Sequence, residues 1–322
     1  MLKTSWFKTD KHIIIALSLL AALLCILFLT YGAKGQWGFV LSFRGVKIFA
    51  LVLIAVAIAV STVLFHTITH NRIITPAIMG FDALYVFIQT SLLFFLGVIE
   101  FINLSGMGKY LLNIVIMVAL FLGLFHWLFL KANRSIFLLA LTGIIIGIFF
   151  RNLSYFIFRL LDPNMFAVLQ GELFSSFNAV ETDLLGISAV IIGLCLVPIY
   201  LMRYKLDILA LGRDKAIALG INYKPNVFGL LAVIAILVSV STALVGPITF
   251  FGLLVSNLAY LIVKNQNHVN LLIVACLIAI CTLVGGQFIF EKLLGLQGTL
   301  SIVIECLGGI TFIWILLRTH RR

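Results

Sequence analysis

Long apolar runs separated by short polar segments make up most of the chain. An α-helix needs about 20 apolar residues to cross the hydrocarbon core of a bilayer, and ten runs near that length occur. They extend over residues 13–31, 46–65, 76–99, 110–130, 136–158, 184–202, 227–244, 248–263, 269–290 and 300–317. The pattern predicts an all-α polytopic membrane protein with about ten transmembrane helices.

The composition is typical of a chain that lies mainly in lipid. Hydrophobic residues make up 63% of the 322 residues, charged residues make up 10%, and the mean hydropathy is +1.24. Soluble domains average about 45–50% apolar and about 25% charged residues. We therefore expect one transmembrane domain over residues 1–322 and no separate soluble domain.

The basic residues predict how the chain is oriented. The formal net charge is +11, and Lys and Arg gather in short loops between the apolar runs, without a stripe of interleaved aromatic residues. This placement indicates membrane orientation and argues against nucleic-acid binding. With the amino terminus in the cytoplasm, most of the 22 basic residues lie inside, so both termini are expected to be cytoplasmic.

One hydrophilic island, residues 206–221, interrupts the second half of the chain. The spacing of its apolar residues predicts one short helix that ends at Gly212 and a second that Asp214 caps and Gly220 ends. Both helices are too short and too charged to span a bilayer. We expect the island to lie at the cytoplasmic face and to offer its apolar side to a partner or to lipid headgroups.

Motifs that would support an enzyme are missing from the sequence. There is no GxxxxGKS/T phosphate loop, no HExxH, no CxxC and no Ser-His-Asp arrangement in an exposed loop. The five cysteines all lie within apolar runs, which is typical of packing residues and not of a disulfide or a metal site. We expect no enzymatic activity, no cofactor or metal bound by this chain, and an energy source on another polypeptide.

Two motifs resemble one transport family. Residues 211–220, LGRDKAIALG, resemble the LG-x-x-x-A-x-x-LG coupling segment of ATP-binding-cassette importer permeases for iron-siderophores, haem and cobalamin. Residues 245–255, VGPITFFGLLV, are similar to the Gly-Pro-Ile signature that follows it in that family. The resemblance implies a fold like that of the cobalamin importer permease and a location in the bacterial inner, or cytoplasmic, membrane. It also implies a separate ATPase subunit that binds ATP and Mg and docks on Leu211, Gly212, Arg213, Asp214, Ala216, Leu219 and Gly220.

The resemblance extends, more weakly, to the outer side of the chain. Arg44 and Lys47 fall where two basic residues of the family meet a periplasmic or lipoprotein substrate-binding protein. The alternative is that both are cations anchored at the membrane interface. The acidic segment 162–183 matches a short periplasmic helix beside the pathway, and Pro163 is expected to start that helix.

Several positions depart from the family pattern and leave the ligand open. The usual Gln is His66, the usual Asn-Pro is Thr75-Pro76, Tyr260 replaces an Arg, and residues 297–301 are a degraded form of a terminal motif. The chain looks most like one of two paired permeases of catecholate-type siderophore importers, with haem or cobalamin as alternative cargo. Bulky residues where two copies would face each other favour a heterodimer with a second permease.

Polar residues within the apolar runs are candidates for the pathway, because a charge in hydrocarbon is costly unless it is paired or faces a wet cavity. Asp82 and Arg151 are candidates to pair, and Gly143 and Gly147 are expected to allow close helix packing. An ion-coupled secondary transporter that uses Asp82, Arg151 or Glu305 is the alternative function, and a membrane enzyme or scaffold is a weaker one. The pathway candidates are Asp82, Tyr85, Arg151, Asn257 and Glu305.

Overall fold

The structure is a computed structural model that describes residues 3–32, 37–131, 136–173, 181–264, 267–293, 295, 303–306, 308–310 and 313. Over these residues it is helical and contains no strand, which confirms the predicted all-α class. The helices are α1 (Lys3–Thr30), α2 (Trp37–Thr69), α3 (Asp82–Asn103), α4 (Gly106–Phe125), α5 (Ile136–Phe158), α6 (Pro163–Leu173), α7 (Thr182–Leu201), α8 (Arg203–Leu209), α9 (Arg213–Ala218), α10 (Tyr223–Val245), α11 (Phe251–Ile262) and α12 (His268–Phe288). Three π-helical turns, η1 (Ala77–Phe81), η2 (His126–Lys131) and η3 (Ile289–Leu293), adjoin them.

Eight helices in the described part of the chain are long and apolar enough to cross a membrane, so the protein is a multi-pass membrane protein. The predicted run 248–263 does not form a full span. Its first residues, 248–250, are not helical, and α11 has only 12 residues, or about 18 Å, which is well short of a hydrocarbon core of about 30 Å. The predicted run 300–317 lies mostly outside the described residues.

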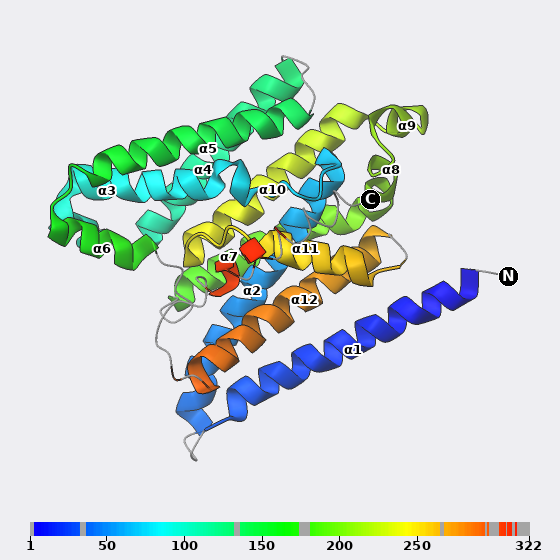
Figure 1. Cartoon of the computed structure of the whole chain (residues 1–322), viewed down its shortest axis with the longest axis horizontal. Helices are drawn as coiled ribbons and strands as arrows, with labels where there is room; N and C mark the ends of the chain where they lie inside the picture. Colours follow the sequence, from blue (N-terminus) through cyan, green and yellow to red (C-terminus); the bar gives the residue numbers. More distant parts are fainter. Residues whose placement is uncertain are drawn as a thin grey trace.

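Two helices lie at the centre of the bundle. About two thirds of the apolar window of α2 and 61% of that of α10 are buried, whereas only 11% of that of α1 is buried. Figure 1 shows α2 and α10 behind and between their neighbours, with α1 along one edge. Because lipid tails are as apolar as a protein core, the exposed leucines and isoleucines of α1 can face lipid without a cost in free energy.

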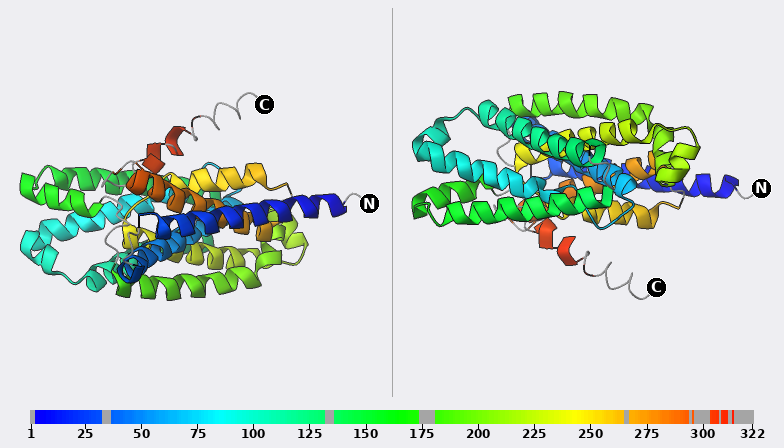
Figure 2. Two further views of the ribbon diagram at one scale, coloured as in Figure 1. Left: turned by 90° about the horizontal axis from the view of Figure 1, so that it is seen from below. Right: turned by 90° about the horizontal axis from the view of Figure 1, so that it is seen from above.

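The two ends of the bundle are distinct. Helices α8 and α9 lie at the same end as the start of α1, and α6 lies at the opposite end (Figures 1 and 2). We name the end with α8 and α9 the inner end and the end with α6 the outer end. Helix α6 begins at Pro163, as predicted from the missing backbone N–H of proline.

Close packing between η1 and α5 depends on glycines, as the sequence predicted for Gly143 and Gly147. A Cβ built on Gly147 would lie 2.7 Å from the Cα of Gly80, which itself has a φ of +106°. A Cβ on Gly143 would lie 2.7 Å from the methyl carbon of Met79. Backbones that approach this closely leave no room for a side chain.

Candidate functional site

The hydrophilic island forms a pair of short helices at the inner end, as predicted. Helix α8 ends at Leu209, and α9 extends from Arg213 to Ala218. Gly212 joins them with a φ of +100°, a conformation that favours glycine. The prediction that Asp214 caps the second helix is wrong, because Gly212 occupies the cap position and Asp214 lies in the first turn.

The faces of this helical pair identify the surface that is open to a partner. Leu206, Leu209 and Ala216 are buried against the chain's own helices. Four apolar or aromatic side chains are at least about half exposed and together form what we name the coupling surface: Tyr204, Leu211, Ile217 and Leu219. Beside it is a hollow of about 370 Å³ lined by Arg213, Ile217, Ile221, Asn222, Tyr223, Lys224 and Pro225.

Ala216, a predicted docking residue, therefore points into the permease itself. Sequence reasoning placed it on the docking side because the family motif contains it. Tyr204 and Ile217 were not among the predicted docking residues. Ile217 also falls within the motif, but it is 49% exposed where Ala216 is fully buried, because one step along a helix turns the side chain by about 100°.

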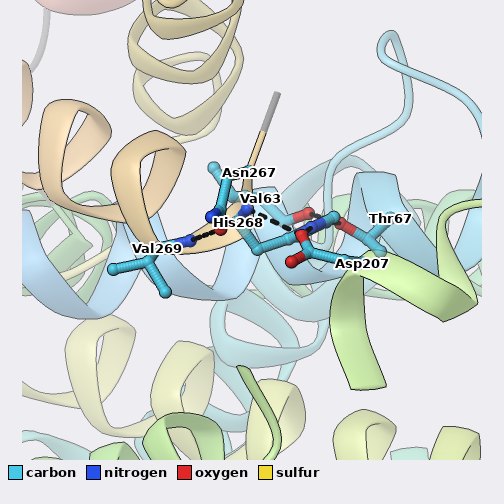
Figure 3. A network of polar contacts seen from close by, with 6 residues as sticks. All are labelled: Val63, Thr67, Asp207, Asn267, His268 and Val269. Carbon is cyan, nitrogen blue, oxygen red and sulfur yellow. Dashed lines mark hydrogen bonds and ion pairs between the residues drawn. The ribbon is translucent and has the colours of Figure 1, made fainter. Parts of the chain in front are cut away.

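A network of polar contacts fastens α8 to two long helices (Figure 3). Asp207 Oδ1 accepts a hydrogen bond from the backbone N–H of His268, at 2.9 Å, and lies 2.6 Å from Nδ1 of the same residue. His268 Nε2 lies 2.9 Å from the hydroxyl oxygen of Thr67 on α2. The Thr67 hydroxyl is also 2.9 Å from the carbonyl oxygen of Val63. His268 and Thr67 were missed at the sequence level, because nothing local in the sequence indicates that their helices meet at α8.

A second polar cluster lies within the bundle around the Gly-Pro-Ile loop. The Thr249 hydroxyl donates to Asp82 Oδ2 at 2.7 Å, and the Glu305 carboxylate lies near the Thr249 backbone. Asp82 also borders a cavity of about 20 Å³, which is about the size of one water molecule. The cavity is lined in part by hydroxyl groups, those of Ser61, Thr62, Thr75, Ser241, Thr242 and Thr249.

The predicted pair of Asp82 and Arg151 does not form. Within the described ranges no ion pair joins the two, and Asp82 is bonded to Thr249. Arg151 is exposed on α5. The Thr249 hydroxyl bonds the Asp82 carboxylate, and Glu305 and Arg151 both lie close enough to act on that carboxylate electrostatically, Arg151 from beyond ion-pair distance.

Asn257 and Tyr260 lie on α11, away from Asp82. The Asn257 amide donates to the carbonyl oxygens of Leu253, at 2.8 Å, and Arg72, at 3.3 Å. The Tyr260 ring has the Arg72 guanidinium 4.2 Å from its centre and stacks on His66 at a centroid distance of 6.0 Å. Both residues thus connect α11 to the end of α2 and the segment after it.

Tyr85 is buried and lines a larger cavity at the outer end, of about 620 Å³. Polar groups from α3, α4 and α6 and from the N-cap of α7 surround this cavity, and they include Gln89, Lys109, Tyr110, Asn113, Glu172 and Glu181. Gln89 Oε1 and Asn113 Oδ1 accept no hydrogen bond from the described residues, although both side chains are buried. Two free acceptors and two carboxylates make this cavity suited to water or to hydrogen-bond donors.

Arg44 and Lys47, the predicted docking pair, lie on the first turns of α2 and contact the chain itself. Arg44 Nη1 donates to the carbonyl oxygens of Phe28, Leu29 and Tyr31 at the end of α1. Lys47 is 6% exposed and forms an ion pair with Glu291 of η3. Both cations therefore bind groups of the chain itself. Arg44 is still partly exposed, whereas Lys47 is buried.

We expect that Lys47→Met lowers the thermal stability of the purified protein, because Glu291 would keep its charge without this partner. Removing one partner of a fully buried pair costs about 3–5 kcal/mol, and the 28% exposure of Glu291 reduces this to about 1–3 kcal/mol. The measurement is thermal unfolding in detergent. Lys109→Met, which breaks a pair with a Glu172 that is 45% exposed, is the control and should change stability by less than about 1 kcal/mol. Equal effects of the two variants would contradict the expectation.

Comparison with known proteins identifies a family. A model of the FecCD transport family matches residues 13–318. The petrobactin import system permease protein YclO of Bacillus subtilis (strain 168) is 44% identical over 95% of this chain and 98% of its own length. Two permease proteins of the petrobactin import system of Bacillus anthracis also match. FatC is 39% identical over 85% of this chain and 78% of its length, and FatD is 26% identical over 84% and 79%.

The fold is also that of a solved structure. A structure described as an inward-facing conformation of a putative metal-chelate type ABC transporter superposes with a TM-score of 0.83. The two chains are 21% identical, and the match covers 96% of this chain and 99% of the other. This likeness concerns the arrangement of the helices alone.

Proposed function

The chain belongs to the FecCD transport family, and we propose that it is the permease subunit of an ATP-binding-cassette importer for an iron–siderophore complex. Its relatives are import permeases, and it is a transport protein and not an enzyme. The observation that carries the mechanism is the pair α8 and α9 at the inner end, with its exposed coupling surface of Tyr204, Leu211, Ile217 and Leu219.

In this function, a separate ATPase subunit binds the coupling surface. An interface of this kind needs apolar anchors that a partner can bury, with charged groups at the rim. The coupling surface supplies the anchors, and Arg213, Asp214 and Lys215 are exposed around them. ATP and Mg bind the ATPase subunit, which lies at the cytoplasmic side of the bacterial inner membrane. The start of α1 lies at the same end of the bundle as α8 and α9 (Figure 1), so the amino terminus is cytoplasmic, and the distribution of basic residues supports a cytoplasmic carboxyl terminus.

The second permease of the importer is a different chain. This sequence is similar to both FatC and FatD, two permease proteins of one system, but it is 39% identical to the first and 26% to the second. That difference supports a heterodimer in which this chain takes the FatC-like place. A substrate-binding protein delivers the complex at the outer end, where the partly exposed Arg44 is the remaining candidate for its docking.

The cargo follows from the same relatives. YclO and FatC are both named for petrobactin import, so we assign an iron–petrobactin complex to this permease. Haem and cobalamin, which other importers of this kind carry, are the alternatives.

The test is reconstitution in proteoliposomes of this chain with its ATPase, its second permease and the binding protein. We expect ATP-dependent uptake of iron-55 supplied as ferric petrobactin, and little uptake of haem or cobalamin. Omitting the second permease should remove uptake, because half of the pathway would be missing.

Two results would contradict this function. Uptake by this chain alone, driven by an ion gradient without ATP, would make it a secondary transporter. A functional complex that contains two copies of this chain and two ATPase subunits would show that the permease is a homodimer.

A further inference from the structure

We propose that Asp207, His268 and Thr67 form the connection through which movement of α8 and α9 reaches the membrane helices α2 and α12. The inference rests on the proposed function, in which an ATPase moves α8 and α9. It concerns residues outside the coupling surface, because His268 and Thr67 are only 4% and 6% exposed. We name these three residues the inner link (Figure 3).

The geometry of the inner link makes it stiff. The imidazole ring of His268 holds its two nitrogens on opposite sides, and it bonds Asp207 with one and Thr67 with the other, at 2.6 and 2.9 Å. A planar ring between two short contacts has little freedom to absorb a displacement of α8. The backbone contact from Asp207 to His268, at 2.9 Å, adds a second attachment at the first residue of α12.

The carboxylate also suits its place at the start of α12. The first N–H groups of a helix lack partners within the helix and carry partial positive charge. Asp207 satisfies the N–H of His268, and Asn267 satisfies that of Val269 at 3.1 Å. Helix α12 is therefore capped in part by a residue of α8, so the two must move together for the cap to be kept.

Apolar packing alone does not provide this connection. Leu206 and Leu209 bury the other side of α8 against the bundle, and close packing also transmits displacement, but hydrophobic contacts are non-directional and fix the register less strictly. Hydrogen bonds depend on distance and angle, so they hold α8 in one register with its neighbours. The inner link is thus the part of the contact that determines whether a push on α8 displaces α2 and α12.

From Thr67 the contacts continue along α2 toward the middle of the bundle. Thr62 lies five residues before Thr67 and packs on Gly252 of α11, where a Cβ would lie 2.2 Å from the Thr62 hydroxyl oxygen. Helix α11 follows the loop in which Thr249 bonds Asp82. A displacement of α2 therefore reaches the polar cluster around Asp82.

The experiment replaces His268 in the complete reconstituted importer and measures ATP hydrolysed per iron complex transported. His268→Leu keeps the volume but breaks both bonds of the ring. We expect transport to fall by about tenfold while ATP hydrolysis stays within about twofold, since coupling energies between sites typically correspond to factors of 5–150. His268→Asn keeps reach to Asp207 only and His268→Gln keeps reach to Thr67 only, and each should lose most of the coupling.

A matched control separates coupling from stability. Ser188→Ala removes the buried bond of 2.6 Å between Ser188 on α7 and Tyr110 on α4, which does not involve α8. It should lower the unfolding temperature without changing the ratio of ATP to transport. The proposal is overturned if His268→Leu leaves that ratio unchanged. Absence of ATP-dependent uptake by the unmodified complex would instead overturn the proposed function.

Discussion

Ile217→Arg is expected to abolish ATP-driven uptake while the permease remains folded and inserted. Ile217 is 49% exposed on α9 in the middle of the coupling surface, so a charge there meets the ATPase and not the permease core. Replacing a hot-spot residue near the centre of an interface costs about 2 kcal/mol or more, which corresponds to a loss of affinity of at least about thirtyfold. Co-purification of the ATPase with the permease and transport in proteoliposomes are the measurements.

Two further variants test where the effect arises. Ile217→Leu keeps an apolar side chain of similar size and should retain ATPase binding and uptake. Ala216→Arg places the same charge on the buried face of α9, where the side chain is fully covered, and should lower the unfolding temperature as well as transport. If Ile217→Arg bound the ATPase normally, the exposed face of α9 would not be the docking site.

Gly147→Val should prevent the accumulation of folded permease. Its Cβ would lie 2.7 Å from the Cα of Gly80 and 3.3 Å from the Gly80 nitrogen. A backbone atom cannot turn aside as a flexible side chain can, so η1 and α5 must separate. Overpacking a core costs about 1–3 kcal/mol and occasionally more. Because η1 and α5 would lose their contact, we expect this variant to be at the upper end of that range. Size-exclusion profiles in mild detergent and thermal unfolding give the result.

Gly193→Val is the matched control for this effect. Gly193 lies on the exposed side of α7, and no atom lies within 4 Å of the Cβ that valine would add. Both variants make the same change in a long apolar helix, so the difference in helix propensity is common to the two. A monodisperse, stable Gly147→Val protein would mean that η1 and α5 do not need their close approach.

The candidate sites were partly predictable. Helix α9 and the turn at Gly212 follow from local rules, because glycine readily adopts a positive φ and short helices end there. Which residues of α9 face outward does not follow from the motif. Ala216 was assigned to the ATPase contact and Ile217 was not. The motif contains residues that dock on the partner as well as residues that pack inside the permease, and it does not distinguish between the two.

Pairing of charges was predicted least well. Asp82 was expected to meet Arg151, but a threonine hydroxyl from the Gly-Pro-Ile loop satisfies its carboxylate. Lys47 was expected to face a binding protein, but it pairs with Glu291, which is 244 residues away in the chain. An unpaired charge in hydrocarbon is unfavourable, so a buried charge is expected to have a partner. The identity of that partner depends on which helices are neighbours.

The all-helical class, the membrane location and the transport family could all be predicted from the sequence. Run length, composition and short motifs are local properties, and the requirement that backbone groups be satisfied in lipid leaves helices as the structure for such runs. The tertiary structure alone decided that α11 is too short to span, that Ala216 faces inward, and that Asp207 meets His268 across 61 residues. The physical reason is that these features depend on contacts between distant segments, and many helix arrangements bury the same apolar residues equally well.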